Sequence, residues 1–133
     1  MKRALAAAIA AVALLGALSA CSSPELPPKS TDPVALTKIY LAAAKAKKCD
    51  VTKALTSSRT WAWCTNPTLQ SYTVASKAEV VPFNPGHRKE TCVATTVTSK
   101  ASGEQEPMNG KREWSFCYTK TGDGWRLTDQ GQG

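Results

Sequence analysis

The chain has 133 residues, with 17 Lys and Arg against 10 Asp and Glu and a formal net charge of +7. At about 100 to 200 residues per domain, this length holds one folded domain and excludes a multidomain enzyme. The hydrophobic fraction of 42% is typical of a globular chain. No basic stripe interleaved with aromatic residues is present, which argues against nucleic acid as a partner.

Residues 1–20 have the pattern of a secretory signal peptide. Lys2 and Arg3 give a positively charged start, and the apolar run from Ala4 to Leu18 contains no charged residue. This run is too short to span a bilayer. We therefore expect an exported protein rather than an integral membrane protein.

The end of this segment, Leu18-Ser19-Ala20-Cys21, resembles the lipobox of bacterial lipoproteins. The resemblance implies that Cys21 carries a diacylglycerol thioether, that cleavage occurs before it, and that the chain is anchored at the extracytoplasmic face of the cell membrane. Two or more acyl chains hold a protein stably on a bilayer. The alternative is an ordinary secreted protein whose cysteine follows the cleavage site.

Residues 21–32 are expected to link the lipidated cysteine to a single domain, residues 33–133. The stretch contains three prolines and few apolar side chains. Because proline-rich segments stay extended at about 3.1 Å per residue, this tether would hold the domain roughly 30 Å from the membrane.

Helices are expected after the tether. Asp32 followed by Pro33 is typical of a helix start, which predicts a helix over residues 33–48. Asp50 is expected to cap a second, shorter helix, and residues 61–64 are expected to add a helical turn. The apolar stripe predicted for the first helix consists of Leu36, Ile39, Tyr40 and Ala43.

Lysines gather where the first helix ends and the second begins. They suit the negative end of the first helix dipole, and they could also face anionic lipid or an anionic wall polymer. The alternative is a solvated helix end. The residues concerned are Lys45, Lys47, Lys48 and Lys53.

From Leu69 onward, the pattern changes to period-two alternation rich in β-branched residues. It predicts strands over residues 71–81, 89–99, 111–119 and 125–129, with loops at 82–87 and 102–110 and a tight turn at 121–124. Helices followed by antiparallel strands predict an α+β fold with the helices packed on one concave face of the sheet.

With Cys21 lipidated, an even number of cysteines remains, which in an exported domain indicates two disulfides. These cysteines are Cys49, Cys64, Cys92 and Cys117. They are too widely spaced for a zinc site, and His87 is the only histidine, so neither a metal nor a cofactor is expected.

Strand geometry favours one of the three possible disulfide connectivities. If Cys92 lies opposite Cys117 in an antiparallel hairpin, Phe116 falls opposite Val93, and the apolar rows of both strands share one face. That pairing leaves Cys49 with Cys64. On the loop-entropy model, closures of about 15 and 25 residues would each contribute roughly 3 kcal/mol.

The element order resembles the NTF2-like superfamily, in particular small bacterial lipoproteins whose last strand reads Gly-x-Trp-Arg. The residues that carry the resemblance are Trp114-Ser115-Phe116, the turn at 121–124 and Trp125-Arg126-Leu127, within a span of about residues 33–130. The resemblance implies a curved antiparallel sheet wrapped around the first helix, which forms a cone with an apolar pocket. Pro82 and Pro85 leave the completeness of the cone open.

Enzymes of this superfamily use a pocket carboxylate with a tyrosine or a second acid. No motif here transfers such a role by position, so no catalytic residue is assigned. Asp50 is interpreted as a helix cap and Asp123 as a turn residue. On a helix, Trp61 and Trp63 could not both be buried by one surface, so one of them is a candidate for a pocket mouth or partner surface. The alternative is that both pack under the loop after Cys64. The full set of candidates is Trp61, Trp63, Tyr72, Trp114, Phe116 and Tyr118.

We therefore expect a membrane-anchored, non-catalytic domain that binds a protein partner or a small apolar ligand held in the cone. Two alternatives remain open from the sequence. One is an enzyme of the isomerase or cyclase kind, which needs an acid inside an apolar pocket. The other is a structural protein of the cell envelope.

Overall fold

The computed structural model describes residues 23–81 and 89–132. The predicted signal peptide, Cys21 and the loop that contains His87 lie outside the described residues. The elements in chain order are α1 (Pro33–Lys45), α2 (Cys49–Leu55), β1 (Thr68–Val74), β2 (Glu79–Val81), β3 (Glu90–Lys100), the 3₁₀ helix η1 (Gly103–Met108), β4 (Gly110–Thr121) and β5 (Gly124–Gly131). The predicted α+β class is confirmed.

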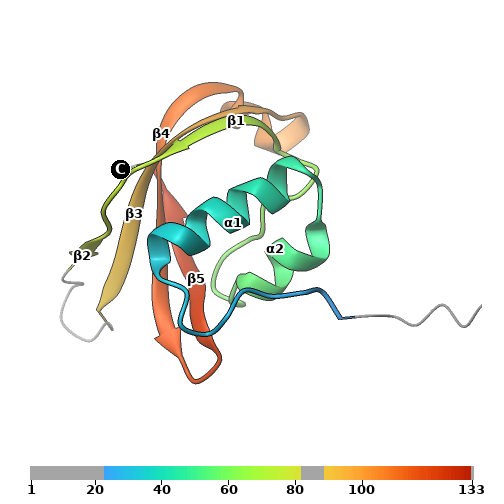
Figure 1. Ribbon diagram of the computed structural model, residues 1–133. Coiled ribbons are helices and arrows are strands. Elements are labelled where there is room, and N and C mark those ends of the chain that lie inside the picture. The colour runs from blue at the N-terminus through green and yellow to red at the C-terminus, as the bar shows by residue number, and fades with distance from the viewer. Residues whose placement is uncertain (1–22, 82–88, 133) are drawn as a thin grey trace, which may run out of the picture.

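The strands form one open antiparallel sheet. Its order is β1-β3-β4-β5, and β2 pairs with the first residues of β3 beyond the end of β1. Both α-helices lie on the same side of the sheet, which bends around α1 (Figure 1). The strand expected over 71–81 is thus two separate strands, and the loop expected over 102–110 contains η1.

Helix α1 starts where the sequence predicts. The Asp32 carboxylate accepts hydrogen bonds from the backbone N–H groups of Val34 and Ala35 at 2.9 and 3.0 Å, and Pro33 is the first helical residue. The helix ends at Lys45 because Lys47 adopts a left-handed conformation with φ 57°. The predicted stripe is wrong at Ile39, which is 39% exposed.

Helix α2 and the segment after it differ from the prediction. The helix begins at Cys49, and Lys48, not Asp50, occupies the capping position without a side-chain hydrogen bond. Asp50 lies within the first turn, where a negative charge still suits the helix dipole. No helical turn forms at residues 61–64, because tertiary hydrogen bonds and the bond to Cys49 hold this segment in an irregular path.

The predicted register of the β3–β4 hairpin is confirmed. Cys92 lies opposite Cys117, and Val93 lies opposite Phe116. Two disulfides are present, Cys92–Cys117 and Cys49–Cys64, which are the pairs that the strand pattern favours. The first links the two strands on the face turned away from the helices, and the second ties the start of α2 to residue 64.

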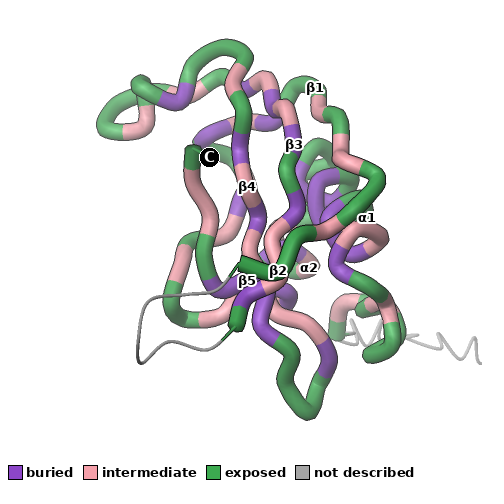
Figure 2. Tube along the Cα trace, turned by 90° about the vertical axis from the view of Figure 1, so that its left-hand side faces the viewer, coloured by how far each residue is buried: buried purple, intermediate pink, exposed green. Residues whose placement is uncertain are grey.

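Buried and exposed positions alternate along β3 and β4, so one face of the sheet belongs to the core (Figure 2). We call this the inner face, and the opposite one the outer face. The buried residues of the core come from the inner face, from the two helices and from residues 63 and 108: Leu36, Tyr40, Leu41, Ala44, Leu55, Trp63, Leu69, Val93, Val97, Met108, Trp114, Phe116, Tyr118 and Leu127.

Residues 27–32, the second half of the segment expected to be an extended tether, pack on the surface of the domain. Lys29 Nζ lies 3.0 Å from an Asp123 carboxylate oxygen in the β4–β5 turn. A Cβ added to Gly124 would come within 3.1 Å of the Lys29 Cα, so only glycine allows this approach. Residues 27–32 follow the domain surface, so this part of the expected tether does not extend away from the domain.

Candidate functional site

The centre of the molecule, where the apolar pocket of a cone would lie, is filled by aromatic side chains. Tyr40, Trp63, Phe116 and Tyr118 are all 0% exposed. Their rings are in contact: the Tyr40 and Phe116 centroids are 5.8 Å apart, and those of Trp63 and Phe116 are 6.4 Å apart. Trp63 enters this space from the irregular segment that the sequence had predicted to be helical. It occupies the volume that a small apolar ligand would need.

Two buried tyrosine hydroxyls are held by neutral partners. Tyr118 Oη lies 2.8 Å from Thr37 Oγ1, and Tyr40 Oη accepts a hydrogen bond from the Trp63 backbone N–H at 2.9 Å. Burial raises the pKa of both phenols, so they remain protonated at neutral pH. Asp50 in the first turn of α2 and Asp129 on β5 are exposed and therefore do not form an acid inside an apolar pocket.

Four side chains form a cluster at one end of the core, which we call the indole corner: Trp61, Trp63, Trp114 and Gln130. The Gln130 amide oxygen accepts hydrogen bonds from the indole N–H of Trp63 at 2.7 Å and of Trp114 at 3.4 Å. Its amide nitrogen donates to Thr60 Oγ1 and to the Trp61 carbonyl oxygen. One side chain thus fixes three tryptophan residues relative to one another.

Trp61 is the exposed member of the indole corner. It is 38% exposed, whereas Trp63 is fully buried, and their ring centroids are 5.3 Å apart at an interplanar angle of 34°. The segment is also fixed by the Cys49–Cys64 disulfide and by the hydrogen bond from Trp63 N–H to Tyr40. The exposed indole therefore rests on a rigid support, and ordering it on contact with a partner would carry a small entropy penalty.

Sequence reasoning missed Gln130. Its place on the inner face opposite Phe116 depends on the β4–β5 register, which contains an irregularity at Cys117 and Tyr118 that the sequence pattern did not indicate. A polar residue at such a position needs hydrogen-bond partners, and tryptophans are the residues that supply buried N–H groups. The other predicted site residues are divided between locations. Trp114, Phe116 and Tyr118 lie in the core, and Tyr72 is partly buried on β1 opposite Val97.

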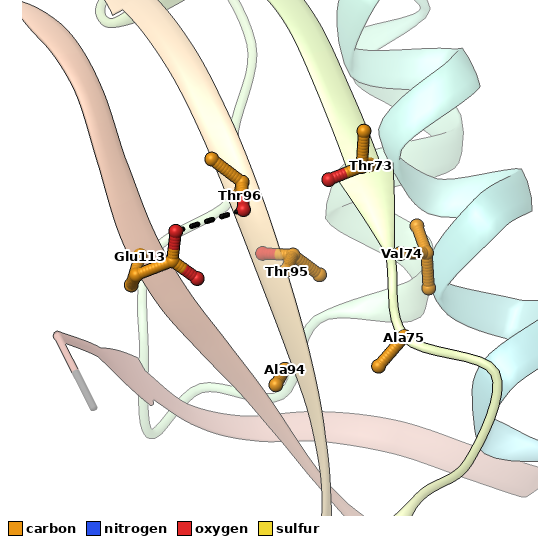
Figure 3. Close-up of a pocket in the computed structure, with 7 residues that line it drawn as sticks. All are labelled: Thr73, Val74, Ala75, Ala94, Thr95, Thr96 and Glu113. Atoms are coloured by element: carbon orange, nitrogen blue, oxygen red, sulfur yellow. Dashed lines mark hydrogen bonds between the residues drawn. The ribbon is translucent and has the colours of Figure 1, made fainter.

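The outer face carries two shallow hollows, which together we call the outer trough. Their volumes are about 220 and 360 Å³, and both are lined by Thr73 and Thr96. The smaller hollow runs between β1 and β4 across β3, and the Thr96 hydroxyl donates to a Glu113 carboxylate oxygen at 2.8 Å (Figure 3). Lys111 lines the larger one. Hydroxyl and charged groups on an open surface do not make the enclosed apolar wall of a typical small-molecule site.

In the ranges 23–81 and 89–132, no group of three His, Cys, Asp or Glu side chains is arranged to hold a metal ion. The helices in these ranges lack the length and hydropathy of a membrane span. No protein-family model, curated protein or solved structure matches the chain.

Proposed function

We propose that this chain is a bacterial lipoprotein, anchored through Cys21 at the extracytoplasmic face of the cell membrane, whose domain binds a protein partner without catalysis. The proposed contact residue is Trp61. The observation that carries the proposal is the contrast within the indole corner, where an exposed indole lies in contact with a fully buried one. Tryptophans in such a setting are typical of binding hot spots.

We further propose that the domain is a filled relative of the NTF2-like cone. Support comes from the element order and from the sheet that bends around α1 (Figure 1). The difference lies in the interior, where Trp63 and Phe116 leave no room for a bound molecule. Binding would then occur on the surface of the domain rather than inside the cone.

The same packing bears on the other functions that the sequence leaves open. A small apolar ligand would have to displace Trp63 from its hydrogen bond to Gln130. An isomerase or cyclase needs a carboxylate beside a polar group in an apolar pocket, and Tyr118 has only Thr37 as a hydrogen-bond partner among the described residues. Both functions are therefore less well supported than a surface interaction.

The test is site-specific photo-cross-linking in the bacterium that produces the protein. A photoreactive phenylalanine analogue replaces Trp61 in one strain and Ile39 in another. Ile39 is the matched control because it is 39% exposed, as against 38% for Trp61, but lies on α1. We expect one protein to be cross-linked from position 61 and not from position 39.

A second arm uses Trp61→Ala in the full-length chain. It should lose co-purification of the cross-linked protein while its thermal midpoint stays close to that of the wild type, because the side chain is partly exposed. Equal cross-linking from both positions, or unchanged co-purification, would rule out Trp61 as the contact. Native mass spectrometry that reveals a bound small molecule would instead support the ligand alternative.

A further inference from the structure

The start of the described chain passes beside the second helix. Ser23, Pro24 and Glu25 line a hollow of about 620 Å³ together with Lys48, Asp50 and Val51. From there the chain follows the domain to Lys29, which is held by Asp123 in the β4–β5 turn. Figure 1 shows this segment in blue, running alongside α2 on the side of the molecule away from β2.

The same side of the molecule carries four exposed lysines, which we call the lysine corner: Lys45, Lys47, Lys48 and Lys53. Lys45 ends α1, and Lys47 and Lys48 follow after the single residue Ala46. Lys53 is three residues after Asp50 on α2, so both project from one face of that helix. Within the described residues none of the four forms an ion pair, and the nearby carboxylates are those of Glu25 and Asp50.

Lys47 occupies a backbone position that favours glycine. Its φ is 57°, and the hydrogen bonds from Lys47 N–H to Ala44 O and from Lys48 N–H to Ala43 O close α1 in the manner usual for a glycine. A side chain in this conformation is strained by its own Cβ. Glycine would close the helix here without this strain, so the lysine side chain is not required for the turn.

We propose that the lysine corner binds the surface of an anionic phospholipid bilayer and so fixes the orientation of the domain on the membrane. The inference rests in part on the proposed anchor at Cys21, because Cys21 precedes Ser23 by two residues, which span at most about 7 Å. A lipid on that cysteine would hold the lysine corner close to the headgroups. Lysines near an anionic membrane surface each add to binding, and a basic patch beside an acyl anchor is a recognised second signal.

This geometry favours lipid over an anionic wall polymer. A wall polymer could be contacted from any side of the domain, whereas a bilayer can be reached only from the side on which the chain leaves toward its anchor. The lysine corner lies on that side.

The test uses the exported chain from residue 21 onward with Cys21→Ser, so that neither the apolar signal peptide nor an acyl chain contributes. Its partition onto vesicles of 30% phosphatidylglycerol in phosphatidylcholine is compared by flotation with its partition onto pure phosphatidylcholine. We expect binding to the anionic vesicles alone, with loss at high salt. Replacing Lys45, Lys47 and Lys48 with Gln should lower the partition coefficient about 100-fold.

Two single variants distinguish an effect of charge on vesicle binding from an effect on the stability of the fold. Lys47→Gly relieves the strained backbone and should keep or raise the thermal midpoint, yet it should weaken vesicle binding about fivefold. Asp50→Asn removes a nearby negative charge and should strengthen binding. The control is Lys77→Gln, in the link between β1 and β2 on the opposite side of the molecule in Figure 1, which should bind as the parent does.

The inference is overturned if the Cys21→Ser chain shows no preference for anionic vesicles, or if Lys77→Gln weakens binding as much as Lys47→Gly. Sedimentation with an anionic wall polymer in the absence of vesicle binding would also overturn it. The anchor is tested separately, by the intact mass of the wild-type chain, in which a diacylglycerol on Cys21 would be visible. Failure of one experiment thus leaves the other interpretable.

Discussion

The two faces of the sheet differ in what packs against them. On the inner face, Val93, Phe116 and Tyr118 meet the helices and Trp63, and all are fully buried. On the outer face, Thr73 of β1, Thr96 of β3 and Ser115 of β4 have no helix above them, and the surface beside Thr73 and Thr96 is hollowed. The inner face, which was expected to enclose a ligand, is therefore filled by side chains, whereas the hollows lie on the outer face.

This contrast places stability and interaction in different parts of the molecule. Substitutions on the inner face should mainly change the free energy of unfolding. Substitutions at exposed positions should mainly change binding. Four variants test the division, from the largest expected effect on stability to the smallest.

Trp63→Ala should lower the free energy of unfolding by about 3 to 5 kcal/mol, because it leaves a large cavity and removes an indole hydrogen bond to Gln130. Chemical denaturation followed by circular dichroism measures the change. Trp61→Ala is the control and should lose no more than about 1 kcal/mol. Similar losses for both variants would mean that the indole corner is not divided into a buried and an exposed half.

Removing the disulfide on the outer face tests what this face contributes. The double variant Cys92→Ala and Cys117→Ala opens a link between residues 25 apart in sequence and should destabilise the domain by about 3 kcal/mol. The hairpin register should persist, because the apolar rows of Val93 and Phe116 still favour it. Amide hydrogen exchange of β3 and β4 would detect a shifted register.

Tyr118→Phe removes one buried hydroxyl and should destabilise the domain by about 1 kcal/mol at neutral pH. The Thr37 hydroxyl already donates to the Pro33 carbonyl oxygen at 2.7 Å, so the Tyr118 hydroxyl is the donor between them. The variant therefore leaves the Thr37 hydroxyl oxygen without its donor, whereas the Thr37 O–H group keeps its acceptor. Thermal unfolding at pH 7 measures this difference.

The same variant has a pH signature. Burial raises the pKa of Tyr118 and Tyr40 above the usual value of 10.0. Below pH 10 both states keep these phenols protonated; above it the unfolded state releases protons first, so wild-type stability should fall as pH rises. Tyr118→Phe should show a shallower fall between pH 10 and 11. Parallel curves would mean that the Tyr118 phenol titrates alike in both states.

Thr96→Val on the outer face should change the free energy of unfolding by no more than about 0.5 kcal/mol. Its hydroxyl donates to Glu113 at an exposed site, where water replaces the lost partner at little cost. Urea denaturation measures this change and compares it with that of Thr95→Val. Thr95→Val should lose more stability, since Thr95 is buried on the inner face and donates to the Trp114 carbonyl oxygen. Equal losses at 95 and 96 would contradict the division between faces.

Features that depend on neighbouring residues could be predicted from the sequence. The start of α1 follows from Asp32 and Pro33, and the pairing of Cys92 with Cys117 follows from the alternation along two strands joined in a hairpin. The same local pattern gives the α+β class. Each of these rests on interactions that a short stretch of sequence already contains.

Features that depend on distant contacts could not be predicted. Trp63 leaves a helical path because Tyr40, Gln130 and the disulfide from Cys64 hold it in the core. The packing of residues 27–32 depends on the absence of a side chain at Gly124, about a hundred residues further along the chain. In the candidate site, Trp61 was identified as one of two possible surface residues, whereas the role of Gln130 became visible only in the folded chain.

The hydrogen bonds of the Gln130 amide also give the protein an intrinsic spectroscopic signal for binding. Because they fix the indoles of Trp63 and Trp114, and because Trp61 lies in contact with Trp63, three of the four tryptophans are coupled at centroid distances of 5.3 and 6.2 Å. Rings this close share their excited states and should give a strong near-ultraviolet circular dichroism couplet. A partner that covers Trp61 would alter this couplet and shift the emission to shorter wavelength, so binding could be followed without any label.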